Sequence, residues 1–427
     1  MREAAVIADD LTGAADCGIA FAAAGLSTFV VLGREDAPVA DQVVAIDTDS
    51  RPLAPAEAAA RTHAAGIRAY RDGARVIYKK LDSTLRGNVG VELAATLRAA
   101  ADAGAGRALA ILAPAFPATG RTTREGRVLV NGVPLDRTEV WRDSGMSGSA
   151  EPAAMLAAAG LRAANVPLAE VRAGIDALVR TLERIGGNAD AVVCDALEEE
   201  DLRSIASAGA RLARSVVWAG SGGLARHLPA ALGLRGDPAR ATPRPRPARG
   251  SVLVLVGSRS SIAREQARRL EAEPGVVRVE LDPQSLLRGE RECGGPGAAL
   301  EAALESGRDV LVAVGEHPMG LERANELAAA AGRLVAPHAA RLAGVAVTGG
   351  DMARALLAAL GAPGLHLLGE VEPGVPLGVV DVAPRGGVDV ATTLPVATKA
   401  GAFGSPETLV RCLAALRPSG VRDKQAT

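Results

Sequence analysis

The chain has 427 residues, of which 48% are hydrophobic and 23% charged, and its formal net charge is -1. This composition is typical of a soluble globular protein with about two or three domains. A net charge near zero argues against nucleic acid or an acidic membrane as the main partner, and an aromatic content of 2% leaves few platforms for stacking bases. The first residues lack the layout of a signal peptide, and no apolar run reaches about 18 residues, so we expect a cytoplasmic protein without a membrane span.

The cysteines are spread along the chain, at Cys17, Cys194, Cys293 and Cys412. Because no C-x-x-C pair occurs, the spacing favours neither a zinc knuckle nor a redox dithiol. We expect buried free thiols rather than a disulfide framework.

The first part of the chain alternates short β-branched runs with alanine-rich runs of helical spacing. This alternation predicts strands buried in a parallel sheet, with helices over both of its faces. We expect strands at residues 5–8, 43–46, 75–78, 109–112, 191–193 and 216–218, and helices that include residues 14–24, 55–70 and 171–185.

A linker is predicted at residues 235–250, which hold four prolines and five arginines and almost no bulky apolar residue. Proline at this density disfavours helices and favours extended chain, although the arginines also suit an anion patch. The strand and helix rhythm then resumes, with strands expected at residues 252–256, 310–314, 345–347 and 394–397. The predicted fold is α/β: two doubly wound, mostly parallel-sheet domains, residues 1–234 and 251–427, with a ligand cleft between them.

Polar residues follow four of the strands predicted in the first domain. Ligands of open α/β sheets bind beyond the carboxyl ends of the strands, so these exits predict a site. Taken singly, each exit is also explained by a solvated turn or a capped helix, although capping accounts for one of Asp9 and Asp10 more readily than for both. The exits are Asp9–Gly13, Asp47–Arg51, Lys79–Gly87 and the segment from Ala113 to Thr122, which includes Arg121.

The residue types at these exits suit a small hydroxylated acid. Lysine and arginine bind carboxylates, and arginine does so through two parallel hydrogen bonds. Aspartate, serine and threonine bind hydroxyl groups, and one such aspartate can act as a general base. The sequence therefore predicts a short polyhydroxy acid as the ligand of the first domain.

Three strand exits of the second predicted domain are rich in glycine, serine and threonine instead. Before a helix N-terminus, such residues form cradles of backbone N–H groups for phosphate. Asp351 suits a Mg²⁺ ion carried by nucleotide phosphates, and Lys399 can add a point charge. Glycine that merely permits a tight turn is the alternative for any one exit, but together the exits predict nucleotide binding. They are Gly257–Ser261, Thr348–Asp351 and Thr398–Gly404.

Other chemistries have weaker support in the sequence. No Walker A motif occurs, and neither H-E-x-x-H nor G-x-S-x-G is present. Residues Gly220–Ala225 fit a dinucleotide fingerprint, but the strand with the acid that binds the ribose would fall in the proline-rich linker, which weighs against NAD. The small residues from Asp143 to Ser149 are typical of either a mobile lid, over Ser144–Ser149, or a surface loop.

Five motifs resemble those of the four-carbon acid sugar kinase family, and they span almost the whole chain in order. The resemblance implies a sugar-binding N-terminal domain, a nucleotide-binding C-terminal domain, and phosphorylation of threonate, erythronate or 3-oxo-tetronate with ATP. The motifs are Ile7–Ala14 (IADDLTGA), Lys80–Gly87 (KLDSTLRG), Ala113–Pro117 (APAFP), Thr348–Asp351 (TGGD) and Lys399–Gly404 (KAGAFG).

The resemblance also implies site residues, position by position. The segment Val130–Asp136 is closer to the threonate and erythronate branches, and Met352 stands where threonine commonly follows the acid. Substrate contacts fall on Asp10, Arg51, Lys80, Asp82 and Ser83. ATP contacts fall on Ser258, Thr348, Gly349, Gly350, Asp351 and Gly401.

The sequence thus predicts a kinase, dependent on ATP and Mg²⁺, that acts on the terminal hydroxyl of a four-carbon sugar acid. Lys80, Arg51 and Arg86 are expected to hold the carboxylate. Asp10 or Asp82 is expected to bind hydroxyls and to accept the proton of the attacking alcohol, and Asp351 to bind the metal. A 3-oxo-tetronate kinase, an NAD-dependent dehydrogenase and a non-catalytic sugar-acid sensor remain alternatives, and the stereoisomer and a homodimer stay open.

Overall fold

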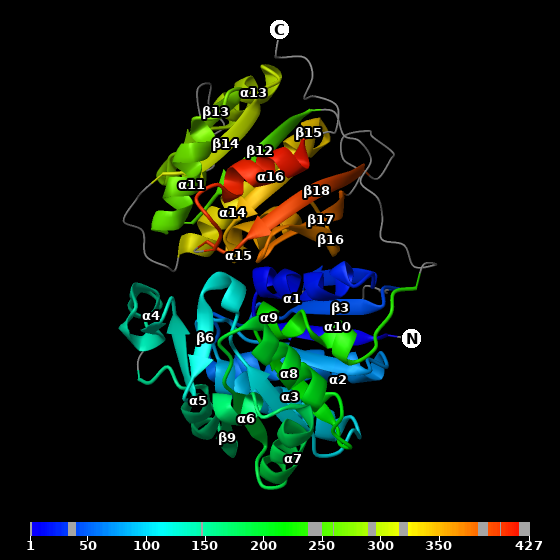
Figure 1. Cartoon of the computed structure of the whole chain (residues 1–427). Coiled ribbons are helices and arrows are strands. Elements are labelled where there is room, and N and C mark those ends of the chain that lie inside the picture. Colours follow the sequence, from blue (N-terminus) through cyan, green and yellow to red (C-terminus); the bar gives the residue numbers. More distant parts are fainter. Residues whose placement is uncertain are drawn as a thin grey trace. The chain divides into compact units, whose positions relative to one another are not determined.

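The computed structural model describes residues 2–32, 40–146, 148–237, 250–258, 260–288, 296–315, 323–382, 392–401 and 403–417. The chain divides into two compact units, Met1–Ala241 and Thr242–Thr427, and each is described by itself (Figure 1). Most of the expected linker, Cys293 and part of the expected lid lie outside the described residues. Cys17, Cys194 and Cys412 are buried free thiols, which confirms the expectation for these three.

The first unit contains a parallel sheet in the order β2-β3-β1-β4-β11-β5-β10-β9. Four of its inner strands, β1, β3, β4 and β5, are buried along their whole length, as expected when helices cover both faces of a sheet. The strands are β1 (Ala4–Ala8), β2 (Thr28–Leu32), β3 (Val43–Asp47), β4 (Val76–Lys80), β5 (Leu109–Ala113), β9 (Ala163–Val166), β10 (Ala191–Cys194) and β11 (Val216–Gly220).

Two layers of helices cover this sheet. One layer holds α1 (Leu11–Ala23), α6 (Leu168–Val171), α7 (Ile175–Gly186), α8 (Glu199–Gly209), α9 (Gly222–Ala225) and α10 (Leu228–Ala231). The other holds α2 (Pro55–Arg71), α3 (Val89–Asp102) and α5 (Pro152–Ala158). The short helix α4 (Glu139–Asp143) and the 3₁₀ turns Pro117–Thr119 and Leu135–Arg137 lie in the connections.

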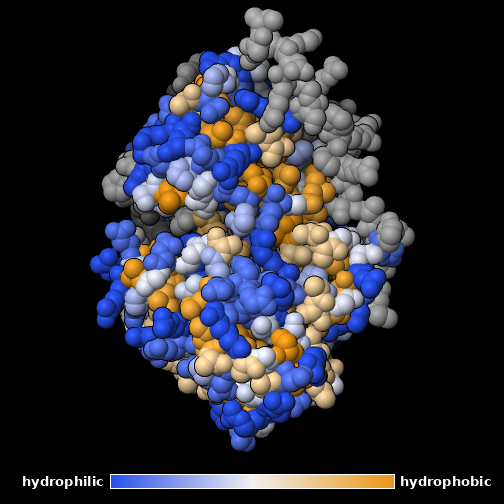
Figure 2. Space-filling view, viewed as in Figure 1, coloured by the Kyte–Doolittle hydropathy of each residue, from blue (hydrophilic) through white to orange (hydrophobic). Residues whose placement is uncertain are grey.

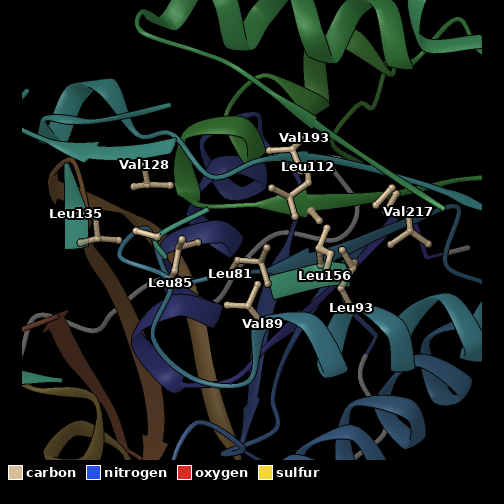
Figure 3. Close-up of a cluster of buried hydrophobic side chains, with 14 of the residues drawn as sticks. Leu81, Leu85, Val89, Leu93, Leu112, Val128, Leu135, Leu156, Val193 and Val217 are labelled. Atoms are coloured by element: carbon tan, nitrogen blue, oxygen red, sulfur yellow. The ribbon is translucent and has the colours of Figure 1, made fainter. Parts of the chain in front are cut away.

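A hydrophobic core fills the space between the sheet and the layer formed by α3 and α5. Figure 3 shows Leu93 of α3 and Leu156 of α5 directed toward Leu112 and Val217 of the sheet. All four side chains are fully buried. Helices α2 and α3 also pack closely, because a Cβ atom on Gly66 would lie 2.6 Å from the Cβ of Ala99. This contact lies near the C-terminal end of α3, the helix that follows the polar segment after β4.

A small antiparallel sheet stands apart from the large one in the first unit. It consists of β6 (Arg121–Arg124), β7 (Arg127–Val130) and β8 (Val133–Pro134). These strands were not predicted, because they are short and half-exposed and show no continuous apolar run.

The second unit contains a mixed sheet in the order β13-β14-β12-β15-β18-β17-β16. Strands β12 to β15 and β18 are parallel, whereas β17 is antiparallel to both of its neighbours. The strands are β12 (Ser251–Val256), β13 (Val276–Leu281), β14 (Asp309–Val314), β15 (Leu342–Thr348), β16 (Gly364–Glu372), β17 (Val375–Val382) and β18 (Thr392–Lys399).

Helices again cover both faces of this sheet. Helices α11 (Ser261–Glu271) and α16 (Thr408–Leu416) pack together on one face, and α14 (Ala324–Val335) and α15 (Gly350–Ala359) on the other. Helix α12 (Pro283–Arg288), helix α13 (Pro296–Glu305) and a 3₁₀ turn at Ala336–Arg341 complete the unit.

The predicted α/β class with mostly parallel sheets is confirmed. The expected cleft between the domains stays a prediction. The expected strand 75–78 is wrong at its end, since β4 continues through Lys80 and both lysines belong to the strand rather than to the turn. Hydrophilic and apolar residues are interspersed over the visible face of the first unit (Figure 2). Among the helices that the structure describes, none has the length and apolar character needed to cross a membrane.

Candidate active site

The polar exits of the first unit meet at a reversal of strand order. Strand β1 lies between β3 and β4. The strands that follow β1 in sequence therefore extend the sheet first on one side of β1 and then on the other. Such a switch point opens a crevice at the carboxyl ends of the strands, where ligands of α/β sheets bind. The residues that follow β1, β3 and β4 therefore lie side by side.

Arg51 bridges two carboxylates at these strand ends. Its Nε and Nη2 donate to the two Asp9 oxygens at 2.8 and 2.9 Å, and its Nη1 donates to Asp10 Oδ2 at 2.7 Å. Burial by itself would lower the pKa of Arg51, but Asp10 and Asp9 raise it well above its ordinary value. The cation thus offsets the repulsion expected between the adjacent carboxylates. Asp9 was not among the predicted site residues, although its position next to Asp10 in the sequence could have identified it.

Asp10 acts as the N-cap of α1. It caps α1 by accepting a hydrogen bond from Gly13 N at 2.9 Å, and it also accepts one from Thr12 Oγ1 at 2.7 Å. Burial would raise the pKa of Asp10, but the charges of Arg51 and Lys80 outweigh it and hold the pKa below its ordinary value.

Asp82 forms a second arginine pair, at the exit of β4. Arg86 donates to it through Nε at 2.8 Å and through Nη2 at 2.9 Å. Burial would raise the pKa of Asp82, but Arg86, Arg51 and Lys80 together hold it well below its ordinary value. The Nη2 atom of Arg51 lies 3.9 Å from Asp82 Oδ1, so the two arginine pairs form one cluster.

Lys80 and Ser83 bring polar groups whose hydrogen-bonding capacity the cluster does not use. The Lys80 side chain is buried, and its Nζ lies 2.9 Å from where a Cβ on Gly13 would stand. Burial would lower the pKa of Lys80, but the acidic groups around it, Asp10 and Asp82 among them, raise it. Within the described ranges the ammonium makes no hydrogen bond or ion pair, and neither does the buried Ser83 hydroxyl. Both groups are therefore available to a ligand.

The fourth exit, after β5, leads through a 3₁₀ turn into β6, which begins at Arg121. Burial lowers the pKa of Arg121, and Asp82 and Arg86 act on it in opposite directions.

We expect acid to weaken the first unit through Asp82. A carboxyl whose pKa is lowered by folding contributes stability above its ordinary value, 3.8, and loses that contribution as the pH falls through the lowered value. The destabilisation caused by Asp82→Asn is therefore expected to shrink as the pH falls from about 7 to about 2, measured by thermal unfolding midpoints. Asp176→Asn, which removes a carboxylate with 74% side-chain exposure, is the control. An Asp82→Asn shift that stays constant over this range would contradict the expectation.

The glycine-rich exits of the second unit also converge. Strand β12 lies between β14 and β15, so a second switch point is found here. A Cβ on Gly401 would lie 2.2 Å from Ser258 Oγ, so the loops after β12 and β18 touch. Gly257 N donates to Thr348 Oγ1 at 3.2 Å, and Gly349 N donates to Lys399 O at 2.8 Å, which joins the loop after β15 to the other two.

The loop after β15 leads directly into a helix. Gly349 has φ +95°, a conformation that favours glycine, and Gly350 is the first residue of α15. Asp351 is exposed in the first turn, whereas Met352 is buried against Gly257. The structure thus brings together Ser258, Thr348, Gly349 and Gly401 and places Gly350 and Asp351 at the adjoining helix N-terminus.

Lys399 has a different role from the one expected. Its Nζ donates to the carbonyl oxygens of Ala400, Gly401 and Phe403 at 3.0, 2.9 and 3.0 Å. An ammonium has three donors, so all of them are used within the loop. Burial lowers its pKa to about 8, partly offset by Cys412 and Glu372. Lys399 therefore holds the loop in place instead of offering a free charge to phosphate.

The geometry adds little support for a metal site made of protein side chains or for NAD binding. In the part of the chain that the structure describes, no group of three or more His, Cys, Asp or Glu side chains is placed to hold a metal ion. The dinucleotide-like glycines serve packing: a Cβ on Gly222 would lie 2.4 Å from the Asp16 carboxylate, and one on Gly223 would lie 2.5 Å from Ala115 O. Both glycines belong to α9, which has only four residues.

Comparisons with known proteins match both units. The family model of a sugar-binding N-terminal domain matches residues 4–228, and that of a nucleotide-binding C-terminal domain matches residues 253–409. A D-threonate kinase from Cupriavidus necator is 44% identical over 413 residues, 95% of this chain and 95% of that protein. A D-threonate kinase from Bordetella bronchiseptica is 37% identical over 429 residues, 96% of this chain and 97% of that protein.

A solved structure shares the fold as well. It is a crystal structure of a protein from Salmonella typhimurium LT2, with a TM-score of 0.76 and 22% identity, covering 96% of this chain and 99% of that one. The domain matches and the curated relatives show that the chain belongs to the four-carbon acid sugar kinase family.

Proposed function

We propose that the protein is an ATP-dependent kinase that phosphorylates the terminal hydroxyl of a four-carbon sugar acid, with D-threonate as the preferred substrate. One observation carries the proposal: the buried Lys80 ammonium and Ser83 hydroxyl, without partners among the described residues, lie at the carboxylate cluster bridged by Arg51. The D-threonate kinases to which the chain is similar support the choice of substrate.

In this proposal the substrate carboxylate binds Lys80. Arg51 and Arg86 are already paired with Asp9, Asp10 and Asp82, so their charges are largely compensated. The Lys80 ammonium makes no hydrogen bond or ion pair with the described residues, so its donors remain for the ligand, and Ser83 adds a hydrogen bond. Arg51 and Arg86 then act mainly by fixing the carboxylates that receive the sugar hydroxyls.

Asp10 and Asp82 are the groups that bind the hydroxyls and take up the proton. The lowered pKa of each keeps it ionised and able to accept hydrogen bonds. Phosphoryl transfer depends mainly on position and charge stabilisation, so a strong base is not required.

The nucleotide binds the second unit, with the backbone N–H groups of Gly350 and Gly401 on the phosphates, while Gly349 N donates to Lys399 O and shapes the turn. Ser258 lies at the same place, in contact with Gly401. Asp351 would hold a Mg²⁺ ion together with phosphate oxygens, since Mg²⁺ commonly takes few protein carboxylates when it accompanies a nucleotide. The exposed position of Asp351 in the first turn of α15 fits that arrangement.

Replacing Gly401 with alanine is expected to weaken ATP binding about tenfold, measured by calorimetry. The new Cβ would lie 2.2 Å from Ser258 Oγ and 2.8 Å from Ser258 Cβ, so Ser258 must move. Gly369→Ala is the matched control, because no atom lies within 4 Å of its new Cβ. Unchanged ATP affinity in Gly401→Ala would remove Ser258 and Gly401 from the nucleotide site.

The proposal is tested by a coupled ADP-release assay with D- and L-threonate, D-erythronate and the 3-oxo-tetronates. D-threonate is expected to give the highest kcat/KM. A higher value for a 3-oxo acid would assign the protein to that alternative, and ATP turnover that no sugar acid stimulates would refute the kinase proposal. Light scattering on the same sample measures whether the protein is a homodimer.

A further inference from the structure

The two successive lysines of β4 serve opposite faces of the sheet. Side chains alternate along a strand, so Lys79 and Lys80 point away from each other. Lys80 reaches the substrate cluster, whereas Lys79 Nζ forms an ion pair with Glu92 Oε2 of α3 at 2.7 Å. The side chains of Lys79 and Glu92 are 0% and 2% exposed, so this is a buried charge pair outside the proposed substrate contacts.

The pair is connected to the loop that carries Arg51. Glu92 Oε1 accepts a hydrogen bond from Ser50 Oγ at 2.6 Å. Ser50 Oγ lies 2.7 Å from Thr48 Oγ1, which donates to Ala8 O at 2.9 Å. The other oxygen of the Glu92 carboxylate is the one that binds Lys79. One carboxylate therefore ties α3, β4 and the loop after β3 together.

The tied loop fixes the backbone of Arg51. The backbone N–H groups of Ser50 and Arg51 both donate to Asp9 O, at 3.1 and 3.2 Å. Asp49, the residue before Ser50, has φ +49°, a left-handed conformation that is unfavourable for a residue other than glycine. Such strain persists where surrounding contacts hold it in place, and the Ser50–Glu92 hydrogen bond is a contact of this kind.

We infer that the buried Lys79–Glu92 pair is a positioning device that sets the Arg51 loop through Ser50. Desolvating two charges is costly, and apolar residues of similar volume often serve stability as well or better. An apolar pair, however, could not accept the hydrogen bond from Ser50. Glu92 and Lys79 are thus positioning residues that act on Asp9 and Asp10 through Arg51.

Two variants test the device without leaving one charge buried alone. Ser50→Ala cuts the link to the loop and keeps the ion pair, whereas the double variant Lys79→Met with Glu92→Leu replaces the pair by apolar side chains. Thr96→Val is the matched control, because its buried hydroxyl donates to Glu92 O on the same helix and does not touch the loop. Circular dichroism and thermal unfolding verify that each variant folds.

The first readout is amide hydrogen exchange of the segment from Thr48 to Leu53. Both test variants are expected to exchange about tenfold faster there than wild type, and Thr96→Val at the wild-type rate. Unchanged exchange in both test variants would overturn the inference. This readout needs no substrate, so it stays decisive even if the proposed kinase function fails.

The second readout rests on the proposed function. The KM for D-threonate is expected to rise about ten- to a hundredfold in both test variants, while the KM for ATP stays within about twofold of wild type. A merely structural role would instead reduce the active fraction, leaving both KM values unchanged, and that outcome would overturn the inference. Absence of wild-type turnover with every sugar acid would refute the proposed function alone.

Discussion

Asp10→Asn is expected to lower kcat/KM for the sugar acid by about 10³-fold and to leave the dissociation constant of ATP within about twofold of wild type. Asparagine keeps a side-chain oxygen that can accept from Gly13 N, so the cap of α1 survives. The lost charge removes the partner of Arg51 Nη1 and the negative group that the lowered pKa keeps ionised beside Lys80. The coupled ADP assay measures the first quantity, and calorimetry measures the second.

Two further variants separate charge from structure. Asp10→Ala also removes the cap, which costs about 1 kcal/mol, so its unfolding midpoint is expected to fall below that of Asp10→Asn. Asp176→Asn removes an exposed carboxylate of the same unit and is expected to keep wild-type kinetics. Wild-type turnover by Asp10→Asn would show that the substrate site does not include this carboxylate.

Lys399→Met is expected to produce the opposite pattern, with ATP binding weakened about a hundredfold and the KM for the sugar acid unchanged. Methionine fills much of the buried volume but leaves the carbonyl groups of Ala400, Gly401 and Phe403 without their donor. Each buried group left unpaired costs about 1–3 kcal/mol, so the loop is expected to leave its position beside Ser258. Calorimetry with ATP and steady-state kinetics with the sugar acid measure the two effects.

Arg278→Met is the control for charge removal in the second unit. Arg278 pairs with Glu271 and Glu280 on the surface, away from the loop that Lys399 holds. It is expected to bind ATP as wild type does. Equal losses of ATP affinity in Arg278→Met and Lys399→Met would mean that net charge, and not the loop, determines binding.

Much of the first site was predictable because parallel strands end at one edge. Once β1, β3 and β4 were expected as strands, the carboxylates and cations after them had to lie near that edge, and the structure joins Asp10, Arg51 and Asp82 there. Their pairing was not predictable, because it depends on side-chain geometry. Arginines that sequence reasoning assigned to the substrate carboxylate are engaged with aspartates instead, which leaves that role to Lys80 in the proposal.

The errors have identifiable physical causes. Charged residues normally end a buried strand, so the pattern gave no reason to extend β4 through Lys79 and Lys80. The partner that makes Lys79 tolerable, Glu92, lies on the next helix and is recognised only after folding. Strands β16 and β17 were missed because an antiparallel pair with one half-exposed member lacks the continuous apolar run of the parallel strands.

The place of β11 in the first sheet has a consequence for biosynthesis. This strand, Val216–Gly220, follows all the other strands of the unit in sequence yet inserts between β4 and β5. A nascent chain that has emerged only to residue 215 therefore has two halves of a sheet with unpaired inner edges, which invite association with other chains. Completion of the unit must wait for this last segment to leave the ribosome, so chaperone dependence is expected to be greatest just before that moment.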